Sequence, residues 1–360
     1  MGVDNLIKDI DGNIIGCPFC GARSLRKDGF NYYAKSKKQV WYCKACCRKT
    51  LQPEVLEESP FSKEGADPEF LPIDTIIDHR KKQYDQKSKA KSDRKLVEIK
   101  IKINGPIGIA HFGDPHVDDD GTDLAKVIHY TDIIKNTEGM FAGNLGDIQN
   151  NWVGRLSFLY GQQSTSAKES WRLSEYFVNK LDWLYLIAGN HDVWSGEGDP
   201  LEFIMRDHKG VYERWGARMN LQFPNGKEVR VNARHFFKGS SIWNTAHGVS
   251  RAAQTGWRDH ILTCGHIHVS GYQVLKDPAS GLISHAIQCA SFKVMDSFAD
   301  TRGLEDKNIF NCPVTIIDPR YKDDDNRLIT TIFNPETGAK YLTYLRKEWK
   351  SENEKRKIRK

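Results

Sequence analysis

The sequence predicts an α/β protein that carries a small metal-stabilised module near its start. From about residue 96 onward, apolar runs typical of buried strands alternate with helical patterns, which is the order expected of βαβ units. Near the start, four cysteines form two Cys-x2-Cys pairs within about 40 residues, a length that buries too little apolar surface to fold without a cross-link. These two observations predict a large α/β body and a separate small module.

The composition supports this organisation. A chain of 360 residues with 39% hydrophobic and 28% charged residues fits a soluble protein with one large core and a small appendage, or with two domains. No run approaches the roughly 18 apolar residues of a membrane span, and the start lacks the basic and apolar segments of a secretion signal. We therefore expect a cytoplasmic protein with no membrane partner.

Changes in composition predict four segments. A zinc ribbon is expected over residues 13–53, and a linker, Pro-rich and then Lys-rich, over residues 54–95 with one short helix near 73–84. The α/β body follows over residues 96–345, and residues 346–360 form a basic tail.

The cysteine pairs predict a structural zinc site. Two Cys-x2-Cys knuckles place four thiolates at the corners of a tetrahedron, which suits zinc and leaves no open position for catalysis. A disulfide framework is the alternative, and a cytoplasmic location disfavours it. Cys47 competes with its neighbour as the fourth ligand, and the spacing favours the set Cys17, Cys20, Cys43 and Cys46.

Basic residues dominate the segment between the knuckles and around them. Nine Lys or Arg residues face one acid, Asp28, between Cys17 and Thr50. Aromatic residues alternate with them, and these either stack on bases or cover the zinc site. The pattern resembles the zinc ribbons of transposases and other DNA-handling proteins, which implies nucleic-acid contacts from Arg26, Lys27, Lys35, Lys37 and Lys38.

The body begins with a predicted hairpin. Residues 96–103 alternate with period two, and Asn104-Gly105 is a turn signal that leads into an apolar run over residues 107–110. That run ends in Asp114 and His116, which we expect to point to one side of an extended segment.

Four more predicted strands end in polar side chains. They cover Met140 to Leu145, Trp183 to Ala188, Glu228 to Arg234 and His260 to Cys264, with helices expected near 124–134, 171–181 and 199–208. Ligands of open α/β sheets bind just beyond the carboxyl ends of such strands. The side chains at those positions are Asp147 and Asn150, then Asn190, His191 and Asp192, then His235, and last His266 and His268.

Each strand end has an ordinary explanation by itself. An Asp after a strand is often a helix cap, and Asn, His and Asp are common in turns. Five successive strand ends with metal-binding side chains are better explained by one shared metal site. His247 competes with His235 for the fourth position, and we favour His235 because it ends a strand, as the others do.

The five motifs in this order resemble the calcineurin-like metallophosphoesterase superfamily, in its repair-nuclease branch. The resemblance covers about Val97 to Pro319, with Asn150 where many members have Asp. It implies a metallophosphoesterase β-sandwich flanked by helices. It also implies that Asp147 bridges two ions, one held with Asp114, His116 and His268, the other with Asn190, His235 and His266.

The same resemblance implies catalytic roles for two residues that follow Asn190. His191 protonates or stabilises the leaving oxygen, and Asp192 or Asp114 fixes its orientation. The ligand set favours manganese, with iron, zinc or magnesium as alternatives. Two ions about 3.5 to 4 Å apart activate a bridging hydroxide that attacks phosphorus in line.

The ribbon and the catalytic motifs together predict a two-metal DNA nuclease or phosphodiesterase of the kind that phages and mobile elements encode. A phosphomonoesterase acting on nucleotides or phosphoprotein, with the ribbon as a docking module, is the alternative. A DNA-binding protein or adaptor without catalysis is a third hypothesis, which the complete ligand set disfavours. DNA is the expected partner, and the sequence is compatible with a homo-oligomer.

Overall fold

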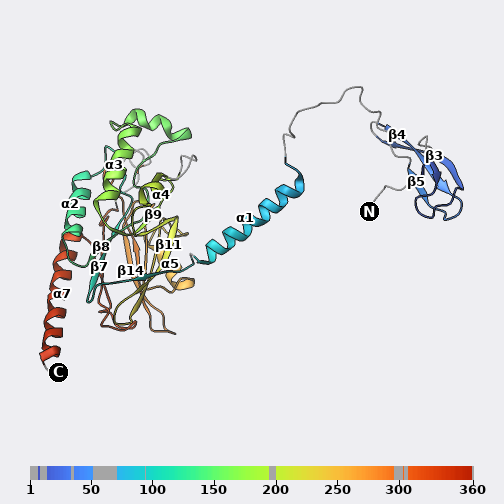
Figure 1. Cartoon of the computed structure of the whole chain (residues 1–360). Coiled ribbons are helices and arrows are strands. Elements are labelled where there is room, and N and C mark those ends of the chain that lie inside the picture. Colours follow the sequence, from blue (N-terminus) through green and yellow to red (C-terminus); the bar gives the residue numbers. More distant parts are fainter. Residues whose placement is uncertain are drawn as a thin grey trace. The chain divides into compact units, whose positions relative to one another are not determined.

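The chain divides into two units, Met1–Ile77 and Asp78–Lys360. The computed structural model describes residues 7–8, 14–33, 36–51, 71–93, 95–193, 200–295, 303 and 307–358 (Figure 1). Lys35, one of the residues expected to contact nucleic acid, lies outside the described residues.

The first unit is built from short antiparallel strands. Strands β1 (Ile7–Lys8) and β2 (Ile14–Gly16) pair with each other, and β3 (Leu25–Tyr33), β4 (Ser36–Cys43) and β5 (Lys49–Leu51) form a sheet in that order. The register of β3 against β4 shifts between Lys27 and Phe30, and Gly29 in this bulge has a φ of 82°. Glycine suits this position because the left-handed backbone is strained for other residues.

Helix α1 (Ile73–Asp93) extends beyond the short helix expected at 73–84. It begins in the first unit and continues into the second. The Lys-rich residues at the end of the expected linker therefore belong to a helix. Lys, Arg and Gln have high helix propensity, so a charged composition did not exclude helix here.

Sheet I of the second unit has six strands in the order β10-β9-β8-β7-β16-β17. The first four are mutually parallel, so their carboxyl ends share one edge. The bounds are β7 (Ile107–Phe112), β8 (Met140–Asn144), β9 (Trp183–Ala188), β10 (Val211–Arg214), β16 (Val314–Ile317) and β17 (Ile329–Ile332).

Sheet II also has six strands, in the order β14-β15-β13-β12-β11-β6. Its central strands β12, β13 and β15 are parallel. The bounds are β6 (Val97–Lys100), β11 (Gly216–Gln222), β12 (Glu228–Arg234), β13 (Ile261–Cys264), β14 (Gly271–Lys276) and β15 (Ile283–Gln288).

The two sheets pack face to face. Ile109 and Ile187 of sheet I share one buried cluster with Met219, Val231 and Ile261 of sheet II. Alternate residues of each strand point to the opposite faces, as the period of a strand requires. The β-sandwich predicted from the motifs is therefore confirmed.

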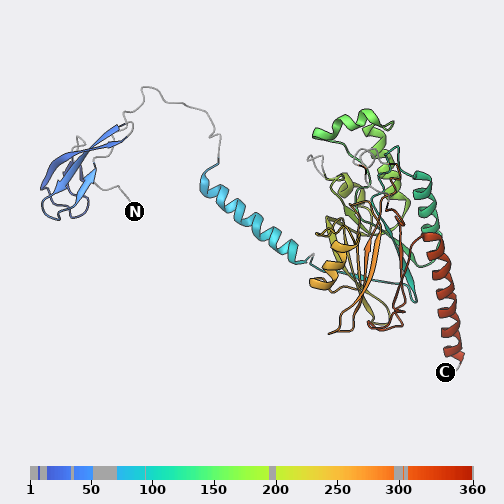
Figure 2. The same ribbon diagram turned by 180° about the vertical axis from the view of Figure 1, so that it is seen from behind.

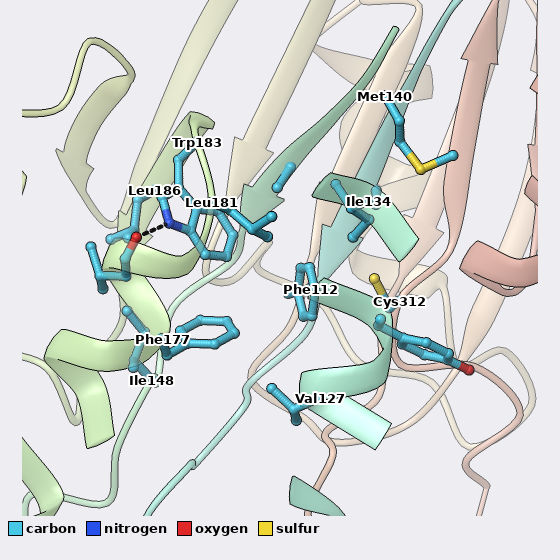
Figure 3. Close-up of a cluster of buried hydrophobic side chains, with 14 of the residues drawn as sticks. Phe112, Val127, Ile134, Met140, Ile148, Phe177, Leu181, Trp183, Leu186 and Cys312 are labelled. Atoms are coloured by element: carbon cyan, nitrogen blue, oxygen red, sulfur yellow. Dashed lines mark hydrogen bonds between the residues drawn. The ribbon is translucent and has the colours of Figure 1, made fainter. Parts of the chain in front are cut away.

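Helices cover the outer faces of the sandwich. Phe112 of β7 packs edge-on against Phe177 and Trp183, with ring centroids 5.6 and 5.7 Å away (Figure 3). Figure 2 shows α5 and α7 on opposite sides of the sheets. The helices are α2 (Leu124–Lys135), α3 (Ala167–Lys180), α4 (Pro200–Met205), α5 (His247–Thr255) and α7 (Pro335–Ile358), with a 3-10 helix η1 (Gly154–Gln162).

The flanking helices differ in length from two expectations. Helix α4 covers Pro200–Met205 within the helix expected at 199–208, where Asp199 lies outside the described residues. Helix α7 continues to Ile358, through residues expected to form a basic tail. None of the helices in the described part of the chain combines the length and apolar character needed to cross a membrane.

The hairpin predicted at Asn104-Gly105 is wrong. Strand β6 lies at the edge of sheet II, where it pairs in parallel with β11, and β7 lies in sheet I. The alternating pattern correctly indicated one partly buried face, formed by Val97 and Ile99, but the turn carries the chain from one sheet to the other. Gly105 has a φ of 88°, and a Cβ there would lie 2.7 Å from the Trp349 ring.

Candidate metal centre

The predicted site residues gather where strands of both sheets end. The segments after β7, β8 and β9 reach one edge of sheet I, and those after β12 and β13 reach the matching edge of sheet II. Asp147 from sheet I meets His235 from sheet II, with Oδ2 and Nε2 3.2 Å apart. The parallel order of the strands therefore brings together residues that are up to 154 positions apart in the chain.

Asp147 is shared by two groups of potential metal ligands. His116, Asp147 and His191 form one group, and Asp147, His235 and His266 form the other, with the ligand atoms of each group within 4.8 Å of one another. Asp147 is 1% exposed. A carboxylate between two imidazole groups is the arrangement that can bridge two ions.

Three further predicted ligands surround this pair of groups. An oxygen of Asp114 lies 3.6 Å from His268 Nε2, and its other oxygen lies 3.7 Å from His235 Nδ1. The amide oxygen of Asn190 lies 2.8 Å from His235 Nε2. The structure thus brings all seven residues predicted as ligands of the dinuclear site into one cluster.

Several polar atoms in this cluster are buried without a protein partner. Both ring nitrogens of His116 and one carboxylate oxygen of Asp114 have no hydrogen bond among the described residues. Buried polar groups without partners cost free energy, and they are uncommon in folded proteins. A divalent cation would satisfy the lone pair on one nitrogen of His116 and those on the Asp114 oxygen, so the residues fit a metal centre.

The electrostatics of the cluster also fit a cation. Burial raises the pKa of Asp114 well above its usual range and lowers that of His116 well below it. Burial likewise opposes charge on His235, but Asp147 and Asp114 outweigh it and raise its pKa to about 10. The same imidazole contacts hold the pKa of Asp147 below its ordinary value despite burial. Metals bind the neutral imidazole and the ionised carboxylate, so a cation at this site would displace protons from His235 and Asp114.

The backbone at the cluster is strained. The φ angle is positive at five candidate ligands: 29° at Asp114, 39° at His116, 51° at Asp147, 74° at His266 and 54° at His268. Residues other than glycine rarely adopt this region, and such strain concentrates at functional sites. The expectation that these pairs lie on extended segments is wrong, because left-handed turns aim the side chains instead.

Glycines make room for the candidate ligands. A Cβ at Gly189 would lie 2.2 Å from Asp147 Oδ1, and one at Gly265 would lie 2.4 Å from Asp114 Oδ1. A Cβ at Gly146 would lie 2.6 Å from His235 Nδ1. Contacts under 3.0 Å force a shift, so these positions accept glycine alone without moving a ligand.

We expect Gly189→Ala to weaken metal binding at this centre by about 10- to 100-fold, the effect typical of residues that orient ligands. The added methyl group displaces Asp147, which both groups share. Manganese affinity measured by isothermal titration calorimetry checks this. Gly256→Ala is the matched control, because the nearest atom to its Cβ is 3.8 Å away. Equal affinities in the two variants would refute the steric argument.

His191 is held by a backbone carbonyl. Its Nδ1 lies 2.6 Å from the Asn150 carbonyl oxygen, which can only accept, so Nδ1 carries a hydrogen. Its Nε2 lies 3.9 Å from Asp147 Oδ2, and its ring meets the His116 ring edge-on at 5.0 Å. Nε2 is therefore the nitrogen presented to the cluster.

Asp192 has a different role from the one expected. Its two oxygens accept backbone N–H groups of Asp147, Ile148 and Gly189 at 2.8 to 3.0 Å. Burial raises its pKa to about 7, and the charge of Asp147 adds to the shift. Asp192 therefore stabilises two turns that carry candidate ligands. The Asn150 carbonyl, and not Asp192, holds the His191 ring.

The fourth motif is represented in the cluster by His235. Its Nδ1 lies 2.8 Å from the Leu145 carbonyl oxygen, which leaves Nε2 directed at Asp147. His247 instead begins α5, with its ring beside Gly239. The choice made from the strand end agrees with this geometry.

The residues that hold Asn150 in place were missed in the sequence. Asp118 accepts its backbone N–H at 2.8 Å, and Asp119 accepts its side-chain amide at 2.8 Å. Lys293 lies 2.9 Å from Asp119. The run of three consecutive aspartates at 118–120, one residue beyond His116, was the available signal. Because Asn150 in turn holds His191, this network extends the site beyond its ligands.

The zinc-type cluster of the first unit is also assembled. Cys17, Cys20, Cys43 and Cys46 form one group, with Sγ distances of 3.6 Å for Cys17–Cys46 and 3.7 Å for Cys20–Cys43. A zinc tetrahedron with Zn–S bonds of about 2.3 Å has edges of about 3.8 Å. Backbone amides of Cys46 and Ala45 lower the pKa of Cys43 to about 6, while burial and the neighbouring thiols raise the pKa of Cys20 and of Cys46, so Cys43 ionises first. The four cysteines therefore fit zinc.

Cys47 takes the place that a glycine holds in the first knuckle. Gly21 donates its N–H to the Cys17 carbonyl with a φ of 70°, and Cys47 donates to the Cys43 carbonyl with a φ of 57°. Cys47 is exposed and outside the cluster. The preference for Cys46 over Cys47 therefore agrees with the geometry.

We expect Cys46→Ser to remove one equivalent of zinc and unfold the first unit, since structural zinc supplies the folding energy of such small modules. Cys47→Gly should retain that zinc and add about 1 kcal/mol of stability, because glycine tolerates positive φ. Elemental analysis and thermal unfolding of the full chain check both results. Loss of zinc from Cys47→Gly alone would reverse the assignment.

The chain is similar to proteins of known structure. No family model matches the sequence, and no curated protein matches it. The chain is similar to GAP50, the anchor in the inner membrane complex of Plasmodium, with 13% identity, a TM-score of 0.33 and coverage of 65% of this chain and 86% of that one. It is similar to Vps29 of Chaetomium thermophilum, with 10% identity, a TM-score of 0.28 and coverage of 63% and 92%.

Proposed function

We propose that the second unit is a calcineurin-like, two-metal phosphoesterase that hydrolyses phosphodiester bonds of DNA. The observation that carries this proposal is Asp147, a buried carboxylate shared by two groups of potential ligands. Buried lone pairs on His116 and Asp114 support it, because a cation would satisfy them.

The ligands divide between two ions. Asp114, His116, Asp147 and His268 would hold one, and Asp147, Asn190, His235 and His266 would hold the other. Divalent ions bound there would polarise phosphoryl oxygens and lower the pKa of a water molecule that attacks phosphorus.

His191 is the proposed proton donor. The Asn150 carbonyl holds Nδ1, so a proton on Nε2 points toward the cluster where a leaving oxygen would form. The neighbouring Trp152 ring meets His191 edge-on at 5.3 Å and limits the positions its ring can take. This arrangement supports general-acid catalysis.

One face of the ribbon sheet supports DNA as the substrate. The two residues of a cross-strand pair lie on the same face of a sheet. The pairs Lys27–Trp41 and Tyr32–Lys37 lie on one face, and Phe30 lies on that face too. Lys27 and Lys37 stack over aromatic rings on this face, 5.8 and 5.1 Å from the centroids of Trp41 and Phe30. Tyr32 is 79% exposed. Exposed rings beside lysines are typical of surfaces that bind single strands.

The same register separates the residues that were expected to contact nucleic acid. Lys27 and Lys37 lie on the face with Tyr32, and Arg26 and Lys38 lie on the other. We therefore assign DNA contacts to the first face, which we call the basic–aromatic face: Lys27, Phe30, Tyr32, Lys37 and Trp41.

We expect Tyr32→Ala to weaken binding of single-stranded DNA by about 5- to 100-fold, the range of one base stacked on an aromatic ring. Lys37→Gln should weaken binding more than Lys38→Gln, because the two lysines lie on opposite faces of the same strand. Fluorescence anisotropy with a labelled oligonucleotide at low salt measures all three. Equal losses for the two lysine variants would contradict the assigned face.

The activity is tested by incubating the full chain with a labelled oligonucleotide and manganese at low salt. Phosphate release from nucleotides and from a phosphopeptide is measured in parallel. DNA cleavage that requires metal supports the proposal. Brisk release of phosphate with intact DNA under each metal tried would favour the phosphomonoesterase instead, and no hydrolysis of either substrate would favour a non-catalytic protein.

A further inference from the structure

The segment of residues 236–246, between His235 and α5, is fixed at both ends beside predicted metal ligands. At its start, the Phe236 ring lies 5.2 Å from the His266 ring, with an angle of 64° between the planes. At its end, the Thr245 hydroxyl donates to the Ser270 carbonyl at 2.6 Å. Ser270 comes two residues after His268. The segment therefore borders the candidate metal centre.

Ser270 gives the segment a rigid support. Its hydroxyl accepts the backbone N–H groups of Ile309 and Phe310 and donates to the Phe310 carbonyl, each at 2.8 Å. The side chain is 3% exposed. Next to it, the Asn244 side chain accepts the Ala246 N–H at 2.9 Å and closes a turn. The end of the segment is thus held by these hydrogen bonds together with the burial of Ala246 in an apolar cluster.

The tip of this segment exposes two large apolar side chains. Ile242 is 84% exposed and Trp243 is 90% exposed. Tryptophan is buried in most positions, because its large apolar area favours burial. Exposed apolar groups that are not scattered singly mark interaction sites. The tip is therefore a surface that a partner would cover.

Chain geometry limits how far the Trp243 backbone lies from the candidate ligands. Two residues of chain span at most about 7 Å between Cα atoms. The Cα atom of Trp243 therefore lies within about 7 Å of that of Thr245, and the Cα atom of His268 within about 7 Å of that of Ser270. One hydrogen bond joins Thr245 to Ser270. The whole path is on the order of 20 Å, or about six stacked nucleotides at 3.4 Å each.

The charge beside the tip favours a nucleic-acid strand as the occupant. Lys238 is exposed on the same segment, which contains no acidic residue. A ring that stacks on a base needs that base to be unpaired, because a paired base already stacks on its neighbours. Lys238 would attract the phosphates of a strand whose base stacks on Trp243.

We propose that Trp243 is a base-stacking residue that holds an unpaired nucleobase within about six nucleotides of the scissile phosphate. This inference rests on the proposed function, because it assumes that a DNA strand lies at the candidate metal centre. It assigns the enzyme a preference for single-stranded DNA or for frayed and gapped duplexes. Trp243 positions the substrate and takes no part in the chemistry.

The test measures binding of a thymidine hexanucleotide, without added divalent metal, to full chains that carry Tyr32→Ala to remove ribbon stacking. Trp243→Ala should raise the Kd by about 5- to 100-fold, and Trp243→Phe by about threefold or less, because phenylalanine retains a stacking face. Trp257→Ala is the matched control. Trp257 is 37% exposed and comes before the first residue of β13, whereas His266 comes after its last residue.

Two further ligands separate base stacking from contacts to the phosphates. A hexanucleotide of abasic sites keeps the phosphates but has no bases, so it should bind equally to the Tyr32→Ala chain with Trp243 and to the one with Trp243→Ala. A fully paired duplex should also bind the two chains equally. Equal Kd values for the hexanucleotide in both chains would overturn the inference. So would an equal loss for the abasic strand, or a change in sedimentation of Trp243→Ala that reveals a protein contact.

These measurements do not depend on cleavage. If binding follows Trp243 but no substrate is hydrolysed, the proposed function fails and the stacking site stands. If DNA is cleaved with metal but Trp243→Ala binds and cleaves single strands normally, the phosphodiesterase stands and the stacking site is refuted.

Discussion

Asp147→Asn is expected to reduce metal at the centre from two equivalents to fewer than one and to abolish hydrolysis. Both groups of ligands share the carboxylate of Asp147, and His235 lies 3.2 Å from it, so no single ion keeps its full set. The loss of activity should exceed the roughly 10²- to 10³-fold cost of removing one electrostatic stabiliser, because both ions are affected.

Elemental analysis and thermal unfolding with and without manganese measure this loss. The wild-type chain should gain about 2.7 kcal/mol of stability at a metal concentration 100 times its Kd, and Asp147→Asn should gain little. Asp182→Asn is the control, because Asp182 is exposed just before β9, at the far end of the strand from the cluster. Two tightly bound manganese ions in Asp147→Asn would disprove the shared-ligand arrangement.

His191→Ala is expected to lower kcat by about 10²- to 10⁴-fold and to leave the metal content unchanged. The ring is held through Nδ1 by the Asn150 carbonyl, so its removal takes away a proton donor and leaves the ligands in place. The loss should shrink for a p-nitrophenyl phosphodiester, since that leaving group needs no proton.

Comparison of the two leaving groups separates acid catalysis from metal binding. His129→Ala provides the matched imidazole deletion, because His129 lies on α2 beside Glu336 with a 59% exposed side chain. Equal losses for the DNA and nitrophenyl substrates in His191→Ala would contradict the acid role. Loss of one metal equivalent would instead make His191 a ligand, as its place in the group with His116 allows.

The site was predictable from the sequence because parallel strands end at one edge. Each apolar run that ends in Asp, Asn or His marks a point on that edge, whatever the distance along the chain. This reasoning located Asp147 and His235 without knowledge of the sheet order. It also favoured His235 over His247, since His247 follows no strand.

Local rules failed where tertiary structure decides the backbone. Asn104-Gly105 has the chemistry of a hairpin turn, but the pairing of β6 with β11 is a long-range contact that no turn signal reveals. The positive φ at Asp114 and His116 is likewise imposed by the surroundings, because neither residue type demands it. The partners of Asp192 are backbone amides, which leave no trace in residue type.

The ribbon shows the same limit at one residue. Regular alternation along β3 would place Phe30 and Tyr32 on the face opposite Lys27. The bulge at Gly29 absorbs one residue, so all three share a face. Spacing alone selected the four cysteines that lie together, but only the register identifies which lysines and rings share a face.

The position of the metal centre between two sheets has a mechanical consequence. Sheet I contributes Asp147 and Asn190, and sheet II contributes His235 and His266, so ions held there would act as cross-links over the open end of the sandwich. Ions with a catalytic role would then also stabilise the contact between the two sheets. The edge that carries the candidate metal centre would be most rigid with metal bound and least rigid without it. The rigidity of the sandwich would therefore depend on the supply of metal in its surroundings.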